Sequence, residues 1–440
     1  MCSVQDGGDT LLKEEATSTS SEGRNCMKCG SPAVANARTK DPFCKVCFNN
    51  YFIHRFRATF GKSRLVSTGE KVLLAFSGGQ NSRVMLALSE EGLSHQVHKK
   101  LRFVPTVIYV DEGALLGLSC EERCHIIGEV LSIAVQSGFS VLFTQLEQVY
   151  GSYEVYDVDL LGCPTSKDSS TAAPREHSAM VSSGTSNVTE GNHATEITDS
   201  RKHFHQCIMD FMSKRRNLSL ETKLKEMFDS TKTQTAKENF VLSLRQRLLS
   251  EVAKKGGFRK VLIGVNATQL AVRLLSNVAQ GRGATLPLDV GFADNRARDV
   301  MILRPIREFP STEIATYATL NQLNTVSLPS LTDKSTDTSS IDHLTTTFIN
   351  GLQANFPSTV STVFRTGDKL MVEASAESTN WPSCALCQAP LTHTADSSVF
   401  SHLAPSEPKQ EFWKNLCYGC RLTIKDTDSD VDTLPPFVAT

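Results

Sequence analysis

The stretch KVLLAFSGGQNSRVML, residues 71–86, holds the strongest fold signal in this chain. Its first part, residues 72–76, is a short uninterrupted apolar run, which is typical of a strand buried on both faces of a parallel sheet. The run stops at Ser-Gly-Gly, residues 77–79, and apolar residues then resume at helical spacing. Strand, glycine turn and helix form the layout of a phosphate-binding turn, because glycine lets the backbone approach an anion and a helix N-terminus offers unpaired N–H groups. An ordinary strand–helix turn explains this stretch equally well. Evidence from the rest of the chain is therefore needed to distinguish it from a phosphate-binding turn.

Further apolar runs alternate with helical patterns in the chain that follows this turn. The runs lie at residues 104–110, 141–143, 261–265 and 300–303. Alternation of strands and helices predicts an α/β fold built on one doubly wound parallel sheet, whose ligands bind outside the carboxyl ends of the strands. Asp111 and Glu112 directly follow the first of these runs. We therefore expect both carboxylates to face the same crevice as the glycine turn.

The polar and glycine residues at this edge of the predicted sheet are candidates for binding a nucleotide or a phosphate. Glycine exposes backbone N–H donors, hydroxyl groups add further donors, and a carboxylate can hold a metal ion that neutralises phosphate charge. The alternative for the carboxylate is a helix or turn cap. The candidates at this edge are Ser77, Gly78, Gly79, Ser82 and Asp111.

The chain contains 13 cysteines, and eight of them form four Cys-x-x-Cys pairs. The first two pairs have the spacing C-x2-C-x14-C-x2-C, close to a zinc template, and the last two have the wider spacing C-x2-C-x29-C-x2-C. Four thiolates close the tetrahedral shell of a structural zinc ion, while free redox pairs or an iron–sulfur cluster are the alternatives. The predicted ligands are Cys26, Cys29, Cys44 and Cys47 in the N-terminal group and Cys384, Cys387, Cys417 and Cys420 in the C-terminal group.

Charge and hydropathy narrow the class of protein. A formal net charge of −1 gives no global basic field, so nucleic-acid binding has to rest on local patches. Two such patches are residues 49–65, where aromatic residues alternate with Arg and Lys, and the basic stretch 201–216. For the first patch, the alternative is a helix with buried aromatics and solvated charges. The sequence has neither a signal-peptide pattern nor an apolar run near the roughly 18 residues of a membrane span, which predicts a cytoplasmic protein without a membrane partner.

Composition divides the chain into five parts. Polar stretches rich in Ser and Thr separate the cysteine groups and the α/β pattern, and such stretches are typical of disorder or linkers. The expected parts are a disordered tail at 1–24, an N-terminal zinc module at 25–50, an α/β domain at 51–326 with a disordered insertion at about 164–200, an extension or linker at 327–380, and a C-terminal zinc ribbon with a tail at 381–440.

The glycine turn resembles the PP-loop of the ATP pyrophosphatases that activate tRNA bases, whose usual form is SGG-x-D-S. This chain has Asn81 where that family has Asp, and Gln80 where its tRNA-thiolating members usually have Lys. With cysteine groups on both sides of the domain, nearly the whole chain resembles the cytosolic tRNA 2-thiolation proteins. The matching motifs are Ser77-Gly78-Gly79 with Ser82, Asp111-Glu112-Gly113, Gly264 with Asn266-Ala267, and Arg304-Pro305. This match adds Asn266 to the candidate nucleotide- or phosphate-binding residues.

The same resemblance exposes two departures from the catalytic members of that group. Catalytic members usually carry Gly-His-Asn-Ala-Asp-Asp after the fourth strand, where this chain has Gly-Val-Asn-Ala-Thr-Gln at residues 264–269. Catalytic members also carry core cysteines, whereas this chain has no cysteine between Cys207 and Cys384. Adenylation needs carboxylates to hold Mg²⁺, and sulfur transfer needs a thiolate. The resemblance is therefore to the second, non-catalytic type of subunit.

That resemblance implies a heterodimer with a catalytic tRNA thiolation subunit, which binds tRNA and takes sulfur from a thiocarboxylated ubiquitin-like carrier to thiolate the wobble uridine. It implies structural zinc in this chain, and ATP with Mg²⁺ in the complex. One alternative is that the chain is itself an active ATP-dependent sulfurtransferase; the other is a zinc-ribbon RNA adaptor whose sheet has no nucleotide role. The active enzyme would use Asp111, Glu112 or Asp294 as metal ligands and Cys120, Cys124 or Cys207 as nucleophile.

Overall fold

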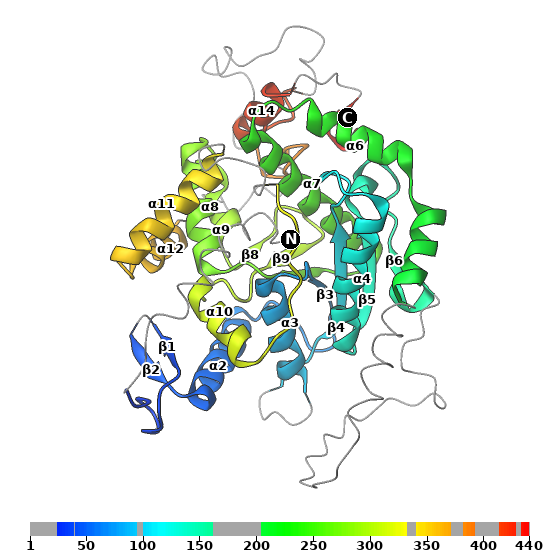
Figure 1. Ribbon diagram of the computed structural model, residues 1–440. Coiled ribbons are helices and arrows are strands. Elements are labelled where there is room, and N and C mark those ends of the chain that lie inside the picture. Colours follow the sequence, from blue (N-terminus) through cyan, green and yellow to red (C-terminus); the bar gives the residue numbers. More distant parts are fainter. Residues whose placement is uncertain are drawn as a thin grey trace.

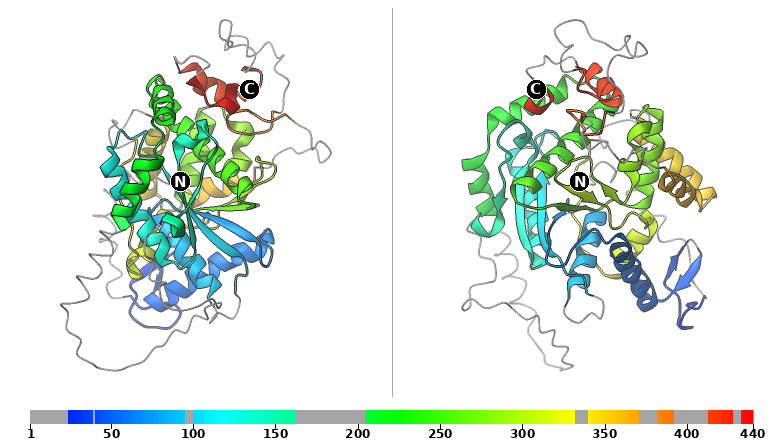
Figure 2. Two further views of the ribbon diagram at one scale, coloured as in Figure 1. Left: turned by 90° about the vertical axis from the view of Figure 1, so that its right-hand side faces the viewer. Right: turned by 180° about the vertical axis from the view of Figure 1, so that it is seen from behind.

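The structure is a computed structural model that describes residues 24–38, 40–94, 100–161, 204–331, 340–370, 382–391, 413–427 and 433–439. The predicted tail, apart from Arg24, and the predicted insertion at 164–200 lie outside these ranges. Figure 1 shows a central sheet with helices on both sides and the two cysteine modules at opposite ends of the molecule, which the views of Figure 2 also show.

The central sheet has seven strands within the described residues, in the order β6-β5-β4-β3-β7-β9-β8. Its five inner strands are parallel, which confirms the α/β class and the parallel core, and the order reverses direction on either side of β3. The two edge strands are antiparallel, so the predicted doubly wound parallel sheet is parallel in its core and mixed at its edges. The strands are β3 (Lys71–Ala75), β4 (Val104–Asp111), β5 (Ser140–Gln145), β6 (Tyr156–Asp157), β7 (Lys260–Ile263), β8 (Ala293–Asp294) and β9 (Met301–Leu303).

Helices cover both faces of this sheet, because β3 alternates buried side chains toward each face. Val72 and Leu74 pack in one apolar cluster with the first group of helices, and Leu73 and Ala75 pack in a second cluster with the other group. The first group is α2 (Lys45–Ser63), α3 (Gln80–Leu93), α4 (Cys120–Gln136) and α10 (Ser311–Leu320). The second is α6 (Leu218–Asp229), α7 (Gln234–Lys255) and α14 (Tyr418–Lys425).

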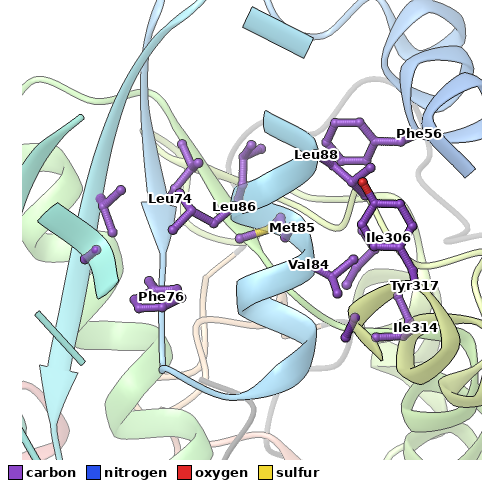
Figure 3. Packing of buried hydrophobic residues seen from close by; sticks show 14 of the residues in the cluster. Phe56, Leu74, Phe76, Val84, Met85, Leu86, Leu88, Ile306, Ile314 and Tyr317 are labelled. Atoms are coloured by element: carbon purple, nitrogen blue, oxygen red, sulfur yellow. The ribbon is translucent and has the colours of Figure 1, made fainter. Parts of the chain in front are cut away.

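Helix α3 fixes the glycine turn because its apolar side chains fill the space between β3 and α10. Figure 3 shows Met85 and Leu86 directed toward Leu74 of β3, while Val84 is directed toward Ile314 of α10. All five side chains are buried. Since burying one such side chain stabilises the fold by about 1.5–3 kcal/mol, this packing holds the N-terminus of α3 in place.

The aromatic residues of the stretch 49–65 are buried in α2, which confirms the structural alternative for them. Phe52 stacks on Phe309 at 4.1 Å between ring centroids and on Tyr317 at 4.5 Å. Arg55 pairs with carboxylates of the domain, and Arg57 pairs with Glu91. These aromatics and arginines join the N-terminal module, with its hairpin β1 (Ala35–Ala37) and β2 (Asp41–Phe43), to the sheet domain.

A third group of helices lies beyond β7 and packs around α8 (Ala267–Ala279). It comprises α9 (Leu286–Val290), α11 (Ile341–Asn355) and α12 (Thr359–Asp368). The last two fall inside residues 327–380, so that segment is a folded extension in its described part rather than a linker. Among the described residues, we find no helix long and apolar enough to cross a bilayer.

Candidate nucleotide crevice and cysteine centres

The glycine turn lies at the point where the strand order reverses, between β3 and β7, and its own hydroxyl groups fold it. The hydroxyl oxygens of Ser77 and Ser82 lie 3.1 Å apart. Ser82 Oγ also accepts from the Ser77 N–H at 3.2 Å and donates to the Gly79 carbonyl at 2.9 Å. Both predicted hydroxyl groups are therefore in the turn, but their hydrogen bonds shape the backbone.

Two glycines allow the close packing of this turn. Gly78 has a φ of +83°, and a Cβ there would lie 2.9 Å from Cγ2 of Val130. A Cβ on Gly264, at the end of β7, would lie 3.0 Å from the backbone N of Ser82. Without side chains at these positions, the chain after β7 touches the turn.

This close approach brings Asn266, a candidate from the family motif, to the glycine turn. Asn266 caps α8 in a capping box with Gln269, and its Nδ2 donates to Oδ1 of Asn81 at 2.9 Å. Both asparagines are buried. The two amides join the N-termini of α3 and α8 across the switch point.

The crevice beside the turn is closed by the segment that follows α10. The N–H of Val326 donates to the Gly78 carbonyl at 3.0 Å. Leu328 and Pro329 then line, with Ser77 and Asp111 among others, a cavity of about 30 Å³. A cavity of that size holds about one water molecule. Gly79, the N-cap of α3, makes no side-chain cap hydrogen bond.

Asp111 lies at this crevice, but its carboxylate is bonded inside the protein. Its Oδ2 accepts from Nε of Arg123 at 2.9 Å and from Nη2 at 2.5 Å, and its Oδ1 accepts from the Gly113 N–H at 2.9 Å. A Cβ on Gly113 would lie 2.5 Å from Cγ of Arg123, so glycine makes room for the arginine. The neighbouring Glu112 pairs with Arg245, whose Nη2 lies 2.6 Å from Oε2.

Arg123 holds two further carboxylates, and we call these residues the Arg123 cluster: Asp111, Arg123, Glu147, Arg216 and Glu221. Its Nη2 lies 2.9 Å from Glu147 and its Nη1 lies 2.6 Å from Glu221, which Arg216 also binds with two hydrogen bonds. The Arg123 side chain has no exposed surface. Three carboxylates face two guanidinium groups, so one negative charge is in excess. Burial raises the pKa of Glu147 to about 7, against the opposing effect of Arg123.

Sequence reasoning missed this cluster, although a signal for it exists. Arg123 lies at helical spacing with Ile127, Val130 and Leu131, all of which are buried. A charged residue on the apolar face of a helix needs buried partners. The partners themselves come from segments far apart in the chain, and only the fold brings them together.

The four sulfur atoms of the N-terminal group, Cys26, Cys29, Cys44 and Cys47, lie within 4.8 Å of one another. Cys44 is the N-cap of α2 and its sulfur accepts from the Cys47 N–H at 3.5 Å. Burial raises the pKa of the Cys26 thiol, but backbone donors outweigh it and lower the value to about 6. Thiolates at such a site are ready to bind a metal ion.

The C-terminal group, Cys384, Cys387, Cys417 and Cys420, also has its four sulfur atoms within 4.8 Å of one another. The module is fastened to the domain by Arg282, whose Nη2 lies 2.8 Å from Oγ1 of Thr423 and 3.2 Å from the Gly419 carbonyl. The thiols of Cys387 and Cys417 are 3.7 Å apart. Four ligands at about 2.3 Å from one zinc ion would be about 3.8 Å apart, so the described thiols fit a single tetrahedral ion.

The other described cysteines do not form a further group of metal ligands within the part of the chain that the structure describes. Cys120 and Cys124 lie on α4, and Cys207 lies in a helical segment at 204–215. Cys124 is buried, and burial together with the nearby Cys120 raises its pKa to about 12. A thiol with that pKa is protonated at neutral pH and is a poor nucleophile.

Sheet order, glycine turn and flanking cysteine groups define an α/β protein with a PP-loop-like fold. The fold is similar to that of the U34-tRNA thiolase NcsA from Methanococcus maripaludis, solved with its [4Fe-4S] cluster: the TM-score is 0.52 at 17% identity, over 86% of this chain and 95% of that one. The chain belongs to the cytoplasmic tRNA 2-thiolation protein 2 family. The sequence pattern of that family matches residues 340–411.

Relatives of the same name match nearly the whole chain. Cytoplasmic tRNA 2-thiolation protein 2-B of Xenopus laevis is 39% identical over 98% of this chain and 94% of its own length. The relative from Danio rerio is 36% identical over 100% of this chain and 95% of its own length. The relative from Homo sapiens is 33% identical over 100% of this chain and 94% of its own length. These matches confirm the family resemblance that the sequence motifs indicated.

Proposed function

We propose that this chain is a non-catalytic subunit of the cytosolic complex that 2-thiolates the wobble uridine of tRNA. It works as a heterodimer with a catalytic subunit, which takes sulfur from a thiocarboxylated ubiquitin-like carrier. Family membership supports the role in tRNA thiolation, and the cytoplasmic location predicted from the sequence agrees with the names of the relatives. This chain provides a folded platform and part of the tRNA-binding surface.

The main support for the non-catalytic role is that arginine side chains already bond the carboxylates at the crevice. Mg²⁺ needs hard oxygen ligands that are free to coordinate it. Asp111 is bonded to Arg123, and Glu112 is paired with Arg245. Because these cations are fixed parts of the fold, the carboxylates are neutralised without a metal ion.

The remaining carboxylate proposed for an active enzyme is engaged in the same way. Asp294 Oδ1 accepts from Nε of Arg296 at 2.9 Å, and its Oδ2 accepts from Nη2 of Arg304 at 3.2 Å. All three side chains are nearly fully buried. A metal ion at Asp294 would have to displace two guanidinium groups, which argues against an independent sulfurtransferase.

We infer that each cysteine group binds one zinc ion with a structural role. The sulfur separations support one ion in each group, because a four-iron cluster gives each thiolate its own iron and so spreads the sulfurs further apart. Four protein ligands leave no open position for substrate. Zinc would fix the N-terminal module and the C-terminal module that contains α14.

Serine substitutions test the non-catalytic role against the active-enzyme alternative. The two subunits are purified, and thiolated tRNA is measured with Cys120→Ser, Cys124→Ser and Cys207→Ser forms of this chain. We expect each form to support thiolation as the wild type does, once thermal unfolding has shown that Cys124→Ser is folded. Loss of thiolation in a folded variant would make that cysteine a sulfur carrier and contradict the proposal.

The closed crevice also supports the second candidate, an RNA adaptor whose sheet has no nucleotide role. Gly78→Leu separates the two, because a side chain at Gly78 would clash with Val130 and shift the turn. If the variant folds, pairs with the catalytic subunit and supports full thiolation, the glycine turn only connects β3 to α3 and has no nucleotide role. That result would support the adaptor role.

A further inference from the structure

Helices α11 and α12 form a hairpin whose inner side is well packed. Ile349 of α11 and Val360 of α12 are buried in one cluster with residues of α8. Figure 1 and the right-hand view of Figure 2 show the hairpin lying on the outer side of α8, away from the sheet. The hairpin therefore meets the protein through the side that packs on α8.

Polar contacts hold this hairpin rigidly on the domain. Arg307 donates to Oδ1 of Asp368 at 2.8 Å, and its guanidinium lies over the ring of Phe364 at 4.5 Å from the centroid. The turn between the helices is fastened by Gln353, which donates to the Pro357 carbonyl and accepts from the Val360 N–H. A rigid surface loses little conformational entropy when it binds a partner.

The outer side of the hairpin exposes large apolar side chains. Leu344 and Phe348 lie one turn apart on α11 and are 55% and 56% exposed, and Phe356 at the end of the helix is 63% exposed. We call these three residues the α11 patch. A hairpin that only covered α8 would gain nothing from apolar residues directed into water, so the patch indicates an interaction surface.

The part of the hairpin that carries the patch lacks charge, and the charged residues of the two helices lie near their outer ends. Residues 344–364 contain no Asp, Glu, Lys, Arg or His, although charged residues make up 21% of the chain. RNA binding depends on Lys and Arg contacts to phosphate, which this surface cannot supply. The cores of protein interfaces are depleted of charge and enriched in aromatic residues. Charge and composition together favour a protein partner with an equally uncharged, apolar surface.

We propose that the α11 patch docks the catalytic subunit of the thiolation complex. This inference rests on the proposed function, which supplies the heterodimer. The segment matched by the family pattern begins at Ser340, the N-cap of α11, so the hairpin belongs to the region that identifies this family. The hairpin packs on α8, whose N-cap Asn266 bonds Asn81 of the glycine turn. A partner on the patch would therefore lie one helix away from the crevice.

Phe348→Asp tests this docking, with Leu218→Asp as its matched control. Leu218 is a similarly exposed apolar residue, 62% exposed, at the start of α6 on the opposite side of the molecule (Figure 1). The dissociation constant for the purified catalytic subunit is measured by biolayer interferometry for the wild type and both variants. We expect Phe348→Asp to weaken binding by about tenfold or more, as for an interface anchor, and Leu218→Asp to leave it unchanged. Thermal unfolding should be the same for all three proteins, because both side chains are exposed.

Each other outcome contradicts a distinct part of the reasoning. If the wild type binds the catalytic subunit and Phe348→Asp binds it equally well, the docking proposal is wrong and the proposed function stands. If the wild type does not bind it, the heterodimer is wrong and the docking proposal falls with it. If Phe348→Asp abolishes self-association or tRNA binding but not subunit binding, the patch serves a second copy or RNA instead.

Discussion

Arg123→Met tests whether the buried guanidinium group stabilises the fold by bonding Asp111, at the carboxyl end of β4, and the other carboxylates of the Arg123 cluster. Methionine has a similar length and keeps most of the apolar contacts, but it removes every hydrogen bond that Arg123 donates to Asp111, Glu147 and Glu221. Glu221 keeps Arg216 as a partner, whereas Asp111 keeps the Gly113 N–H. The variant therefore leaves buried negative charge with too few partners.

The expected loss of stability is about 3–5 kcal/mol, because breaking a buried ion pair from one side leaves an uncompensated charge. Such a loss is a large part of the roughly 5–15 kcal/mol that stabilises a typical native protein. Since the remaining carboxylates can take up protons, the loss should be smaller at about pH 5 than at about pH 8. That dependence on pH distinguishes a charge effect from a packing defect.

Equilibrium unfolding in urea, followed by circular dichroism on zinc-saturated protein, measures this loss. Lys254→Met is the control: its partner Asp299 is 63% exposed and the pair lies on the surface, so we expect no measurable change. An Arg123→Met variant that loses less than about 1 kcal/mol at both pH values would refute the reasoning, since removal of even one hydrogen-bonded partner in the interior costs that much.

Three further predictions follow from the same contacts. Burial raises the pKa of Glu147 to about 7 from 4.5, so the native protein holds a proton that the unfolded chain has released, and stability falls as pH rises through that window. Glu147→Gln, which stays neutral, should flatten this part of the pH profile of unfolding; an unchanged profile would contradict the assignment. Gly264→Val should move the glycine turn or destabilise the protein by about 1–3 kcal/mol, since its Cβ would meet the backbone of Ser82, and a crystal structure with an unmoved turn and wild-type stability would rule this out. Elemental analysis should find close to one zinc ion per cysteine group, and Cys384→Ser should lose one ion and unfold its module, because binding free energies of about 10–16 kcal/mol are folding free energy in such sites. Iron in place of zinc would overturn the metal assignment.

The parts of the fold that follow from sequence are those with a local pattern. The inner strands were predictable because each is a continuous apolar run, and the cysteine groups because ligand spacing is local. The edge strands β6 and β8 have two residues each, which is too short for a periodic signal. The segment after α10 fitted either a folded extension or a linker because Ser and Thr dominate its composition, whereas α11 and α12 bury apolar residues on α8.

The candidate site was only partly predictable for a similar reason. The family motif indicated Asn266, which the structure places beside the glycine turn. Asp111 was placed at the same edge, but its partner Arg123 lies in the next helix and could not be assigned from spacing. The closure by Val326 also escaped prediction, because one backbone hydrogen bond to Gly78 leaves no sequence pattern.

The most direct test of the non-catalytic role is the formation of AMP from ATP with unmodified tRNA. It is measured for the zinc-loaded chain alone, for the catalytic subunit alone, and for both together. We predict no tRNA-dependent AMP from this chain alone, and AMP with thiolated tRNA when both subunits are present, at a higher yield than the catalytic subunit gives alone. Formation of AMP by this chain alone in a tRNA-dependent way would show that it is an enzyme in its own right and would contradict the account.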